Sequence, residues 1–122
     1  MKFWTLGAKI AKFTQQYYSP LVDLGNSGTA KTVDWDAGNE QRVVLTGNVV
    51  LTFSNPVNGG RYVLAAYSGA GAFTITWPAS VLWPGGVAPV MTVTAARTDL
   101  FTFIYVATTG KYHGAFSQDY AG

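Results

Sequence analysis

The chain has 122 residues and no cysteine, which excludes disulfide bonds and thiol chemistry. Only 11% of its residues are charged, whereas 15% are aromatic. A single domain of this length can bury a core of its own, but so few charges predict an apolar surface that another subunit or protein covers. The formal charge of +2 arises near the N-terminus and not on one face of a folded body, so nucleic-acid binding is not expected.

Residues 1–20 are predicted to form an anchoring arm, separate from a domain over residues 21–122. Apolar residues recur there at steps of three and four, which predicts one stripe of a short helix that Ser19-Pro20 ends. The stripe would dock the arm on a partner; packing on its own domain and a frayed end are the alternatives. Binding to a membrane surface is not favoured, and no apolar run is long enough to cross a bilayer. The candidate docking residues are Phe3, Trp4, Leu6, Ile10 and Phe13.

The first half of the domain is expected to contain a strand and a hairpin. Residues 21–30 look like a linker or turn, and residues 31–35 like a short strand followed by a turn over residues 36–39. The quartet Val-Val-Leu-Thr occurs twice, at residues 43–46 and 49–52, around Gly47-Asn48. Two β-branched runs around such a dipeptide predict an antiparallel hairpin. Both of its faces would be apolar, which suits a strand pair covered on both sides.

The second half repeats short β-like runs between glycine and proline turns. Alternating side chains predict a strand over residues 73–77, and Phe101, Phe103 and Tyr105 are expected to share one face of another. Seven or eight short strands at this spacing predict an all-β fold, an antiparallel β-sandwich or jelly-roll-like module. The strands expected in this half cover residues 61–67, 73–77, 90–94, 100–106 and 111–116.

Two Trp-Pro steps, at residues 77–78 and 83–84, predict a rigid aromatic loop that leaves the sheet, because proline has no N–H for a ladder. The two indoles and Tyr112 could stack on sugar rings, as in carbohydrate-binding β-modules. They could equally fill the core and a subunit interface, where aromatic side chains dominate burial. Because few charged or polar groups accompany them, the interface is preferred for Trp77, Trp83 and Tyr112.

The residues predict no enzyme, no metal site and no cofactor. His113 is the only histidine and has no thiol to join it in a zinc site. Asp34 and Asp36 have the spacing of paired carboxylates in glycosidases, or of calcium ligands, but the turn that follows them favours a turn-capping role. A Ser-His-Asp triad with Asp99 or Asp119 would lack a nucleophile elbow.

Short motifs are distributed over about three quarters of the chain. They are Val33-Asp34-Trp35-Asp36, Leu45-Thr46-Gly47-Asn48-Val49, Leu51-Thr52-Phe53-Ser54-Asn55-Pro56, Gly59-Gly60-Arg61-Tyr62, Thr76-Trp77-Pro78, Trp83-Pro84-Gly85-Gly86, Asp99-Leu100-Phe101-Thr102-Phe103 and Tyr112-His113-Gly114. With them, residues 23–114 resemble a β-module of tailed-bacteriophage virion surface proteins, of the decoration or tail-fibre type. The resemblance implies a structural module of the virion that is commonly oligomeric. It implies no catalytic residues that could be assigned to positions of this chain.

A short arm on one compact β-domain is expected of a capsid decoration (cement) protein. Such copies would cluster as homotrimers on the outer surface of the capsid, and their arms would bind the major capsid protein or other virion proteins. Clustering would strengthen weak arms through effective concentration. The alternative is a receptor- or glycan-binding module of the tail or a fibre that contacts a host-surface glycan. A small glycosidase using Asp34 and Asp36 is a remote third class.

Overall fold

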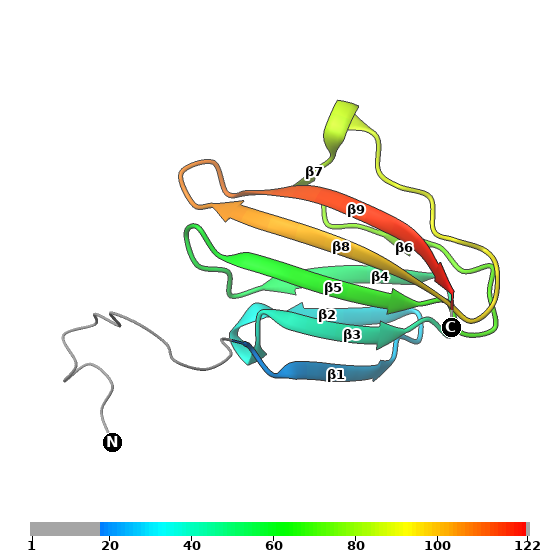
Figure 1. Cartoon of the computed structure of the whole chain (residues 1–122). Helices are drawn as coiled ribbons and strands as arrows, with labels where there is room; N and C mark the ends of the chain where they lie inside the picture. Colours follow the sequence, from blue (N-terminus) through cyan, green and yellow to red (C-terminus); the bar gives the residue numbers. More distant parts are fainter. Residues whose placement is uncertain (1–17, 122) are drawn as a thin grey trace, which may run out of the picture.

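The computed structural model describes residues 18–121, which form two β-sheets (Figure 1). The larger sheet, sheet A, has the strand order β1-β3-β5-β8-β9-β7, and the smaller one, sheet B, has the order β2-β4-β6. Two 3-10 turns, η2 and η3, lie between strands. The bounds are β1 Leu21–Asn26, β2 Ala30–Asp34, η2 Trp35–Ala37, β3 Glu40–Val44, β4 Val49–Ser54, β5 Arg61–Tyr67, β6 Ile75–Thr76, β7 Val81–Leu82, η3 Pro84–Gly86, β8 Arg97–Val106 and β9 Lys111–Ala121.

The chain alternates between the two sheets from β1 to β6. Strands β1, β3 and β5 are parallel neighbours in sheet A, where Leu21 pairs with Glu40 and Glu40 with Val63. Strands β2, β4 and β6 are parallel neighbours in sheet B, where Ala30 pairs with Val50. Each passage through both sheets therefore adds one strand to each, as in a short β-solenoid. In Figure 1, β2 and β4 of sheet B run in the direction opposite to β1, β3 and β5 of sheet A.

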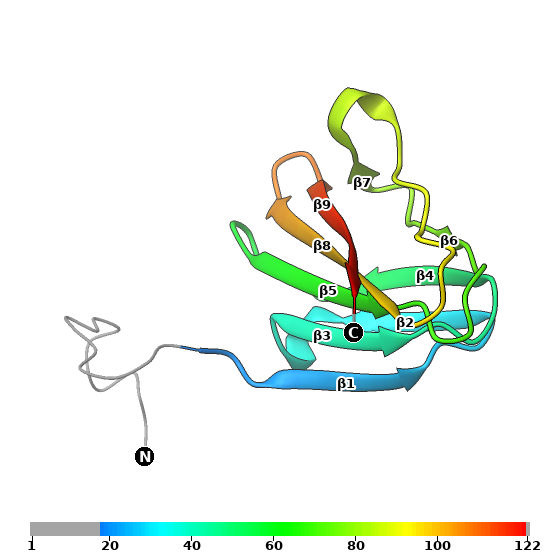
Figure 2. The same ribbon diagram turned by 45° about the vertical axis from the view of Figure 1, so that its right-hand side comes forward.

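The β8–β9 hairpin completes sheet A. Strand β8 is antiparallel to β5 and to β9, and the short β7 lies parallel to the other side of β9 (Figures 1 and 2). The all-β prediction is confirmed. The expected antiparallel pairing is wrong for most of the fold, since five of the seven strand pairs are parallel. Successive strands from β1 to β6 enter different sheets, so neighbours within each sheet are parallel, and the antiparallel β8 makes sheet A mixed.

The predicted hairpin over residues 43–52 is not formed. Strand β3 lies in sheet A and β4 in sheet B, so Gly47-Asn48 turns a corner between sheets. The Leu45 N–H donates to Tyr67 O at 2.9 Å, and the Val49 N–H donates to Thr74 O at 2.9 Å. The corner points one set of side chains from both quartets into the same interior, which a tight hairpin would have split between two faces. That buried set is Val43, Leu45, Val49 and Leu51.

Contacts between successive corners of the coil explain why residues 43–52 do not fold back into a hairpin. The Thr46 N–H donates to the buried Ser27 Oγ at 3.1 Å, and the Gly28 N–H donates to Thr46 Oγ1 at 2.9 Å. A Cβ atom on Gly47 would lie 3.1 Å from Gly28 O, so a larger residue would press on the neighbouring corner. These contacts hold the corner of one coil against the corner of the coil before it.

Other boundaries differ from expectation in three places. Residues 21–30 contain strand β1, an edge strand with a partly exposed side-chain pattern that left little sequence signal. Residues 90–94 are not a strand, and the run over residues 73–77 is reduced to β6. The strands expected at residues 31–35, 61–67, 100–106 and 111–116 are present, although β8 begins three residues earlier and β9 ends five residues later than expected. The predicted arm lies outside the described residues, including Phe3, Trp4, Leu6, Ile10 and Phe13; residues 18–20 alone are described, without helix or strand.

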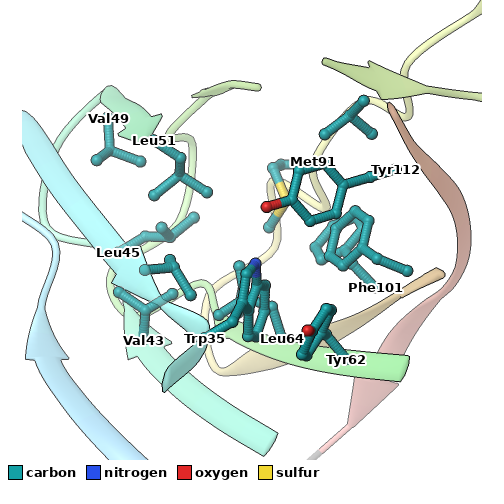
Figure 3. Close-up of a cluster of buried hydrophobic side chains, with 14 of the residues drawn as sticks. Trp35, Val43, Leu45, Val49, Leu51, Tyr62, Leu64, Met91, Phe101 and Tyr112 are labelled. Carbon is teal, nitrogen blue, oxygen red and sulfur yellow. The ribbon is translucent and has the colours of Figure 1, made fainter. Parts of the chain in front are cut away.

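The core lies between the sheets and has an aliphatic and an aromatic part. In Figure 3 Val43, Leu45, Val49 and Leu51 gather on one side, and Phe101 and Tyr112 on the other. Phe101 and Phe103 are buried and Tyr105 is half-buried, which confirms their predicted shared face. In the aromatic part the side chains meet mostly edge to face, and such pairs add to the stability that burial alone provides.

Candidate functional site

The aromatic residues singled out from the sequence meet in the core. The Trp77 and Trp83 rings have centroids 5.1 Å apart at 68°, and Trp77 also meets Phe101 at 4.6 Å. Tyr112 is 3% exposed and Trp83 9%, whereas Trp77 is half-buried. Little of the Trp83 and Tyr112 surface is therefore open to a sugar ring or to another subunit.

Burial determines the acid–base state of Tyr112. Loss of solvent raises the pKa of its phenol to about 12, the neighbouring Tyr105 and Tyr62 phenols add to the rise, and the Trp35 indole opposes it. The hydroxyl is therefore neutral at physiological pH. Tyr112 is a packing residue of the core in this structure.

An exposed apolar segment contains Trp83 and continues beyond it along the chain. We call residues 82–93 the apolar loop; they connect β7 to the approach of β8, and in Figures 1 and 2 the part around η3 stands away from both sheets. Val90 is 81% exposed and Val87 70%. Leu82 and Val93 are exposed as well. These side chains are spread along the loop, since Leu82 pairs with His113 near the start of β9 whereas Val90 O accepts from Gln118 near its end. Each of them leaves apolar surface that the core of the domain does not cover.

Backbone hydrogen bonds and a buried anchor fix the shape of the loop. The Gly86 N–H donates to Trp83 O at 2.9 Å, and both Gly85 and Gly86 have positive φ, at 66° and 75°. Glycine adopts these angles at little cost, which allows the tight turn of η3. Further along, Met91 is buried in the core and the Gln118 amide donates to Val90 O at 2.7 Å. The exposed valines are therefore held in place and not left on a free chain.

Asp99 is the buried centre of these contacts. Its carboxylate accepts hydrogen bonds from Thr92 N at 2.9 Å, Thr92 Oγ1 at 2.7 Å, Gln118 Nε2 at 3.0 Å and Asp119 N at 2.9 Å. Burial alone would raise the pKa of Asp99, but the donated hydrogen bonds outweigh it and hold the pKa below its ordinary value. The ionised side chain thus joins the end of the apolar loop to β8 and to the irregular part of β9.

The remaining candidate residues Asp34, Asp36 and His113 lie on three different elements, β2, η2 and β9. Asp34 Oδ1 accepts from Asp36 N and from Asn55 Nδ2, both at 3.0 Å, which confirms the turn-capping role. The hydrogen bond from Asn55 and then that from Asp36 lower the pKa of Asp34. His113 is exposed on β9 and pairs in register with Leu82. Among residues 18–121, no three side chains of His, Cys, Asp or Glu are placed to hold a metal ion.

The domain also has a hollow of about 330 Å³. It is lined by Tyr18, Ser19, Asn39, Glu40 and Arg61, where β3 and β5 begin. Its lining combines an aromatic ring with amide, carboxylate and guanidinium groups. In the part of the chain that the structure describes, no helix is long and apolar enough to cross a membrane.

Comparison of the chain with protein-family models, with curated protein sequences and with solved structures gives no match. Function must therefore be argued from the residues and their arrangement. Sequence reasoning missed the apolar loop and the role of Asp99. A signal for the loop was present, since residues 62–96 contain no Asp, Glu, Lys, Arg or His.

Proposed function

We propose that this chain is a structural protein of a tailed-bacteriophage virion, an oligomeric capsid decoration (cement) protein. The resemblance of residues 23–114 to virion β-modules supports the class. The structural observation that carries the proposal is the apolar loop, because an exposed apolar surface of fixed shape favours contact with other proteins. Holding that surface in one conformation lowers the entropy lost when it is covered.

In this proposal the arm and the domain have separate tasks. The arm contributes the contact with the shell, through the apolar stripe that contains Phe3, Leu6 and Ile10. The β-domain holds copies together on the outer surface of the capsid. When one arm of a cluster is bound, the others are held close to their sites, so weak single contacts give a tight assembly.

Deletion of residues 1–17 tests the docking step. Capsids of the same phage that lack this protein are mixed with the full chain or with the shortened chain, and bound protein is measured by co-sedimentation. Deletion should abolish binding, and Ile10→Asp should weaken it, whereas Lys9→Ala, a change beside the stripe, should leave most of it. A shortened chain that binds as well as the full one contradicts the proposal.

Glycan recognition at a tail or fibre is the second candidate, and the hollow at residues 18–19, 39–40 and 61 favours it. An aromatic ring beside polar groups is the usual arrangement of a sugar subsite. A glycan array probed with the full chain tests this function, with Arg61→Ala as the variant and Lys111→Ala as the control. Glycan binding that is lost only with Arg61→Ala would favour recognition over cementing.

A further inference from the structure

The hollow lies where two neighbouring strands of sheet A begin. Glu40 is the first residue of β3 and Arg61 the first of β5, and the register pairs Glu40 with Val63. Side chains two residues apart in a strand point to the same face, so Arg61 shares with Val63 the face that carries Glu40. It is the outer face of the sheet, because Gln41 and Tyr62, the next residues in each strand, are buried. One carboxylate and one guanidinium therefore line the same hollow from adjacent strands.

The turn before β3 fixes this arrangement. The Asn39 amide nitrogen donates to Arg61 O at 2.8 Å, and the Val63 N–H donates to Asn39 O at 2.8 Å. The amide nitrogen of Asn39 is thus used within the fold, which leaves its side-chain oxygen as an acceptor. Polar groups that strand ends hold in place lose little entropy when a ligand binds to them.

The two charged groups of the hollow keep their hydrogen-bonding capacity. Among residues 18–121 the single ion pair joins Arg97 and Asp119, so Glu40 and Arg61 are not paired with each other. A carboxylate only accepts hydrogen bonds, and a guanidinium only donates them. Because their formal charges cancel, the lining has no net charge.

We infer that the hollow binds a neutral sugar unit through two adjacent hydroxyl groups. A hydroxyl both donates and accepts, so one of the pair donates to the Glu40 carboxylate while the other accepts from the Arg61 guanidinium. Tyr18, which is 69% exposed, offers its ring to the apolar face of the sugar. A volume of about 330 Å³ is near the lower end of ligand sites, which suits the end of a glycan. The inference rests on the glycan recognition proposed above as the second candidate function, and it is independent of docking on a capsid.

An acidic sugar fits this lining less well. Its carboxylate would gain a hydrogen-bonded pair with Arg61, but it would meet the like charge of Glu40 in the same hollow. Arg61 is the one base among the residues that line the hollow, so no second cation offsets this repulsion. A pair of neutral hydroxyls is not repelled and loses less hydration on entering. The lining therefore selects against a charged ligand.

Matched pairs of methyl glycosides test the inference on the full chain. The glucoside, galactoside and mannoside are each compared with the corresponding uronide, which carries a carboxylate in place of the primary alcohol. Dissociation constants are measured by saturation-transfer difference NMR at neutral pH. At least one neutral glycoside should bind about tenfold or more tightly than its acidic counterpart.

The outcomes separate this inference from the proposals on which it rests. Equal or tighter binding of the acidic members overturns the inference but leaves glycan recognition in place. Binding of none of the six glycosides overturns both the inference and glycan recognition, whereas co-sedimentation with capsids still decides the docking proposal by itself.

Glu40→Gln locates the selectivity. It keeps the shape of the side chain and removes its charge, so an acidic glycoside should bind the variant within about twofold of its neutral counterpart. Asp36→Asn is the matched control, because it removes the same charge from an exposed aspartate of η2 outside the hollow, and it should keep the wild-type preference. If Glu40→Gln keeps the full preference, or if both variants lose it equally, the inference is overturned.

Tyr18→Ala tests the stacking contact. It should weaken binding of the preferred neutral glycoside by about threefold or more, because the ring face is lost. Tyr120→Ala is the control, since Tyr120 is an exposed tyrosine of β9 outside the hollow, and it should bind as the wild type does. Unchanged affinity in Tyr18→Ala, or equal losses in the two variants, counts against the inferred site.

Discussion

The indole of Trp83 lies against the backbone of Gly114, which sits on β9. A Cβ atom on Gly114 would be 2.6 Å from the ring carbon Cζ3 of Trp83, well inside van der Waals contact. The glycine therefore makes room for the indole beneath the apolar loop. The packing of Trp83 also fixes where η3 starts, because η3 follows Trp83 directly.

We predict that Gly114→Ala destabilises the domain by about 1–3 kcal/mol, since the added methyl group must displace a buried ring. Urea unfolding followed by tryptophan fluorescence measures the change. The same substitution in a Trp83→Phe background should cost less, because the smaller ring leaves space for the methyl group. An equal cost in both backgrounds would mean that the contact between these two residues is not the cause.

Asp99 should be the most sensitive polar residue of the domain. Asp99→Asn keeps the shape but replaces one acceptor oxygen by a donor that faces Thr92 or Asp119, so a buried hydrogen bond becomes a donor–donor contact. We expect a loss of about 2 kcal/mol in the free energy of unfolding. Asp36→Asn, on an exposed aspartate of η2, is the control and should change stability little. Comparable losses for both variants would contradict the role of Asp99.

Stability should fall in acid for the same reason. The pKa of Asp99 is lowered in the folded state, so its contribution to stability is complete above the unfolded pKa of about 3.9 and is lost as the pH falls through the folded value. Urea unfolding between about pH 5 and pH 2 should show this decline, and Asp99→Asn should flatten it. Thr92→Val removes one donor and should give an intermediate slope. Parallel pH profiles for the wild type and Asp99→Asn would exclude Asp99 as a source of the stability lost in acid.

The strands that side-chain alternation marked clearly could be predicted from the sequence. Strand β5 matches its predicted bounds, and the face shared by Phe101 and Phe103 is the buried one. In these strands the core covers one face, so the hydrophobic residues that alternate along the sequence are also the buried ones. Strand β1 was not predicted. It lies at the edge of sheet A, where all of its side chains are partly or fully exposed, so its sequence needs no alternating hydrophobic pattern.

The pairing of strands could not be predicted from the same pattern. Gly47-Asn48 is compatible with both a hairpin turn and a corner, and the choice depends on contacts with Ser27 and Gly28, which are distant in sequence. Likewise, two valines in the segment 90–94 suggested a strand, but Asp99 holds Thr92 in an irregular loop. Such long-range hydrogen bonds leave no local signal.

The candidate site, like the fold, could be predicted from the sequence only in part. A turn-capping role for Asp34 followed from local spacing and is confirmed. Trp83 and Tyr112 were expected to fill the core and a subunit interface or to contact a glycan, and the structure places both side chains in the core. The uncharged stretch from residue 62 to residue 96 was visible in the sequence. Its meaning required the structure, which shows that part of it is exposed.

Alkaline conditions should destabilise the fold through Tyr112. Its pKa is raised to about 12 in the folded state, against 10.0 for an ordinary tyrosine, so the unfolded chain loses this proton first as the pH rises. The contribution of Tyr112 to stability is then complete below pH 10 and decreases between about pH 10 and pH 12.

Tyr112→Phe keeps the ring in the core but has no proton to lose, so the stability of this variant should decline less steeply with rising pH. Urea unfolding across this range measures both slopes, with Tyr120→Phe, on an exposed residue of β9, as the control. If Tyr112→Phe and Tyr120→Phe follow the wild-type curve equally, burial of the Tyr112 phenol does not govern the alkaline transition.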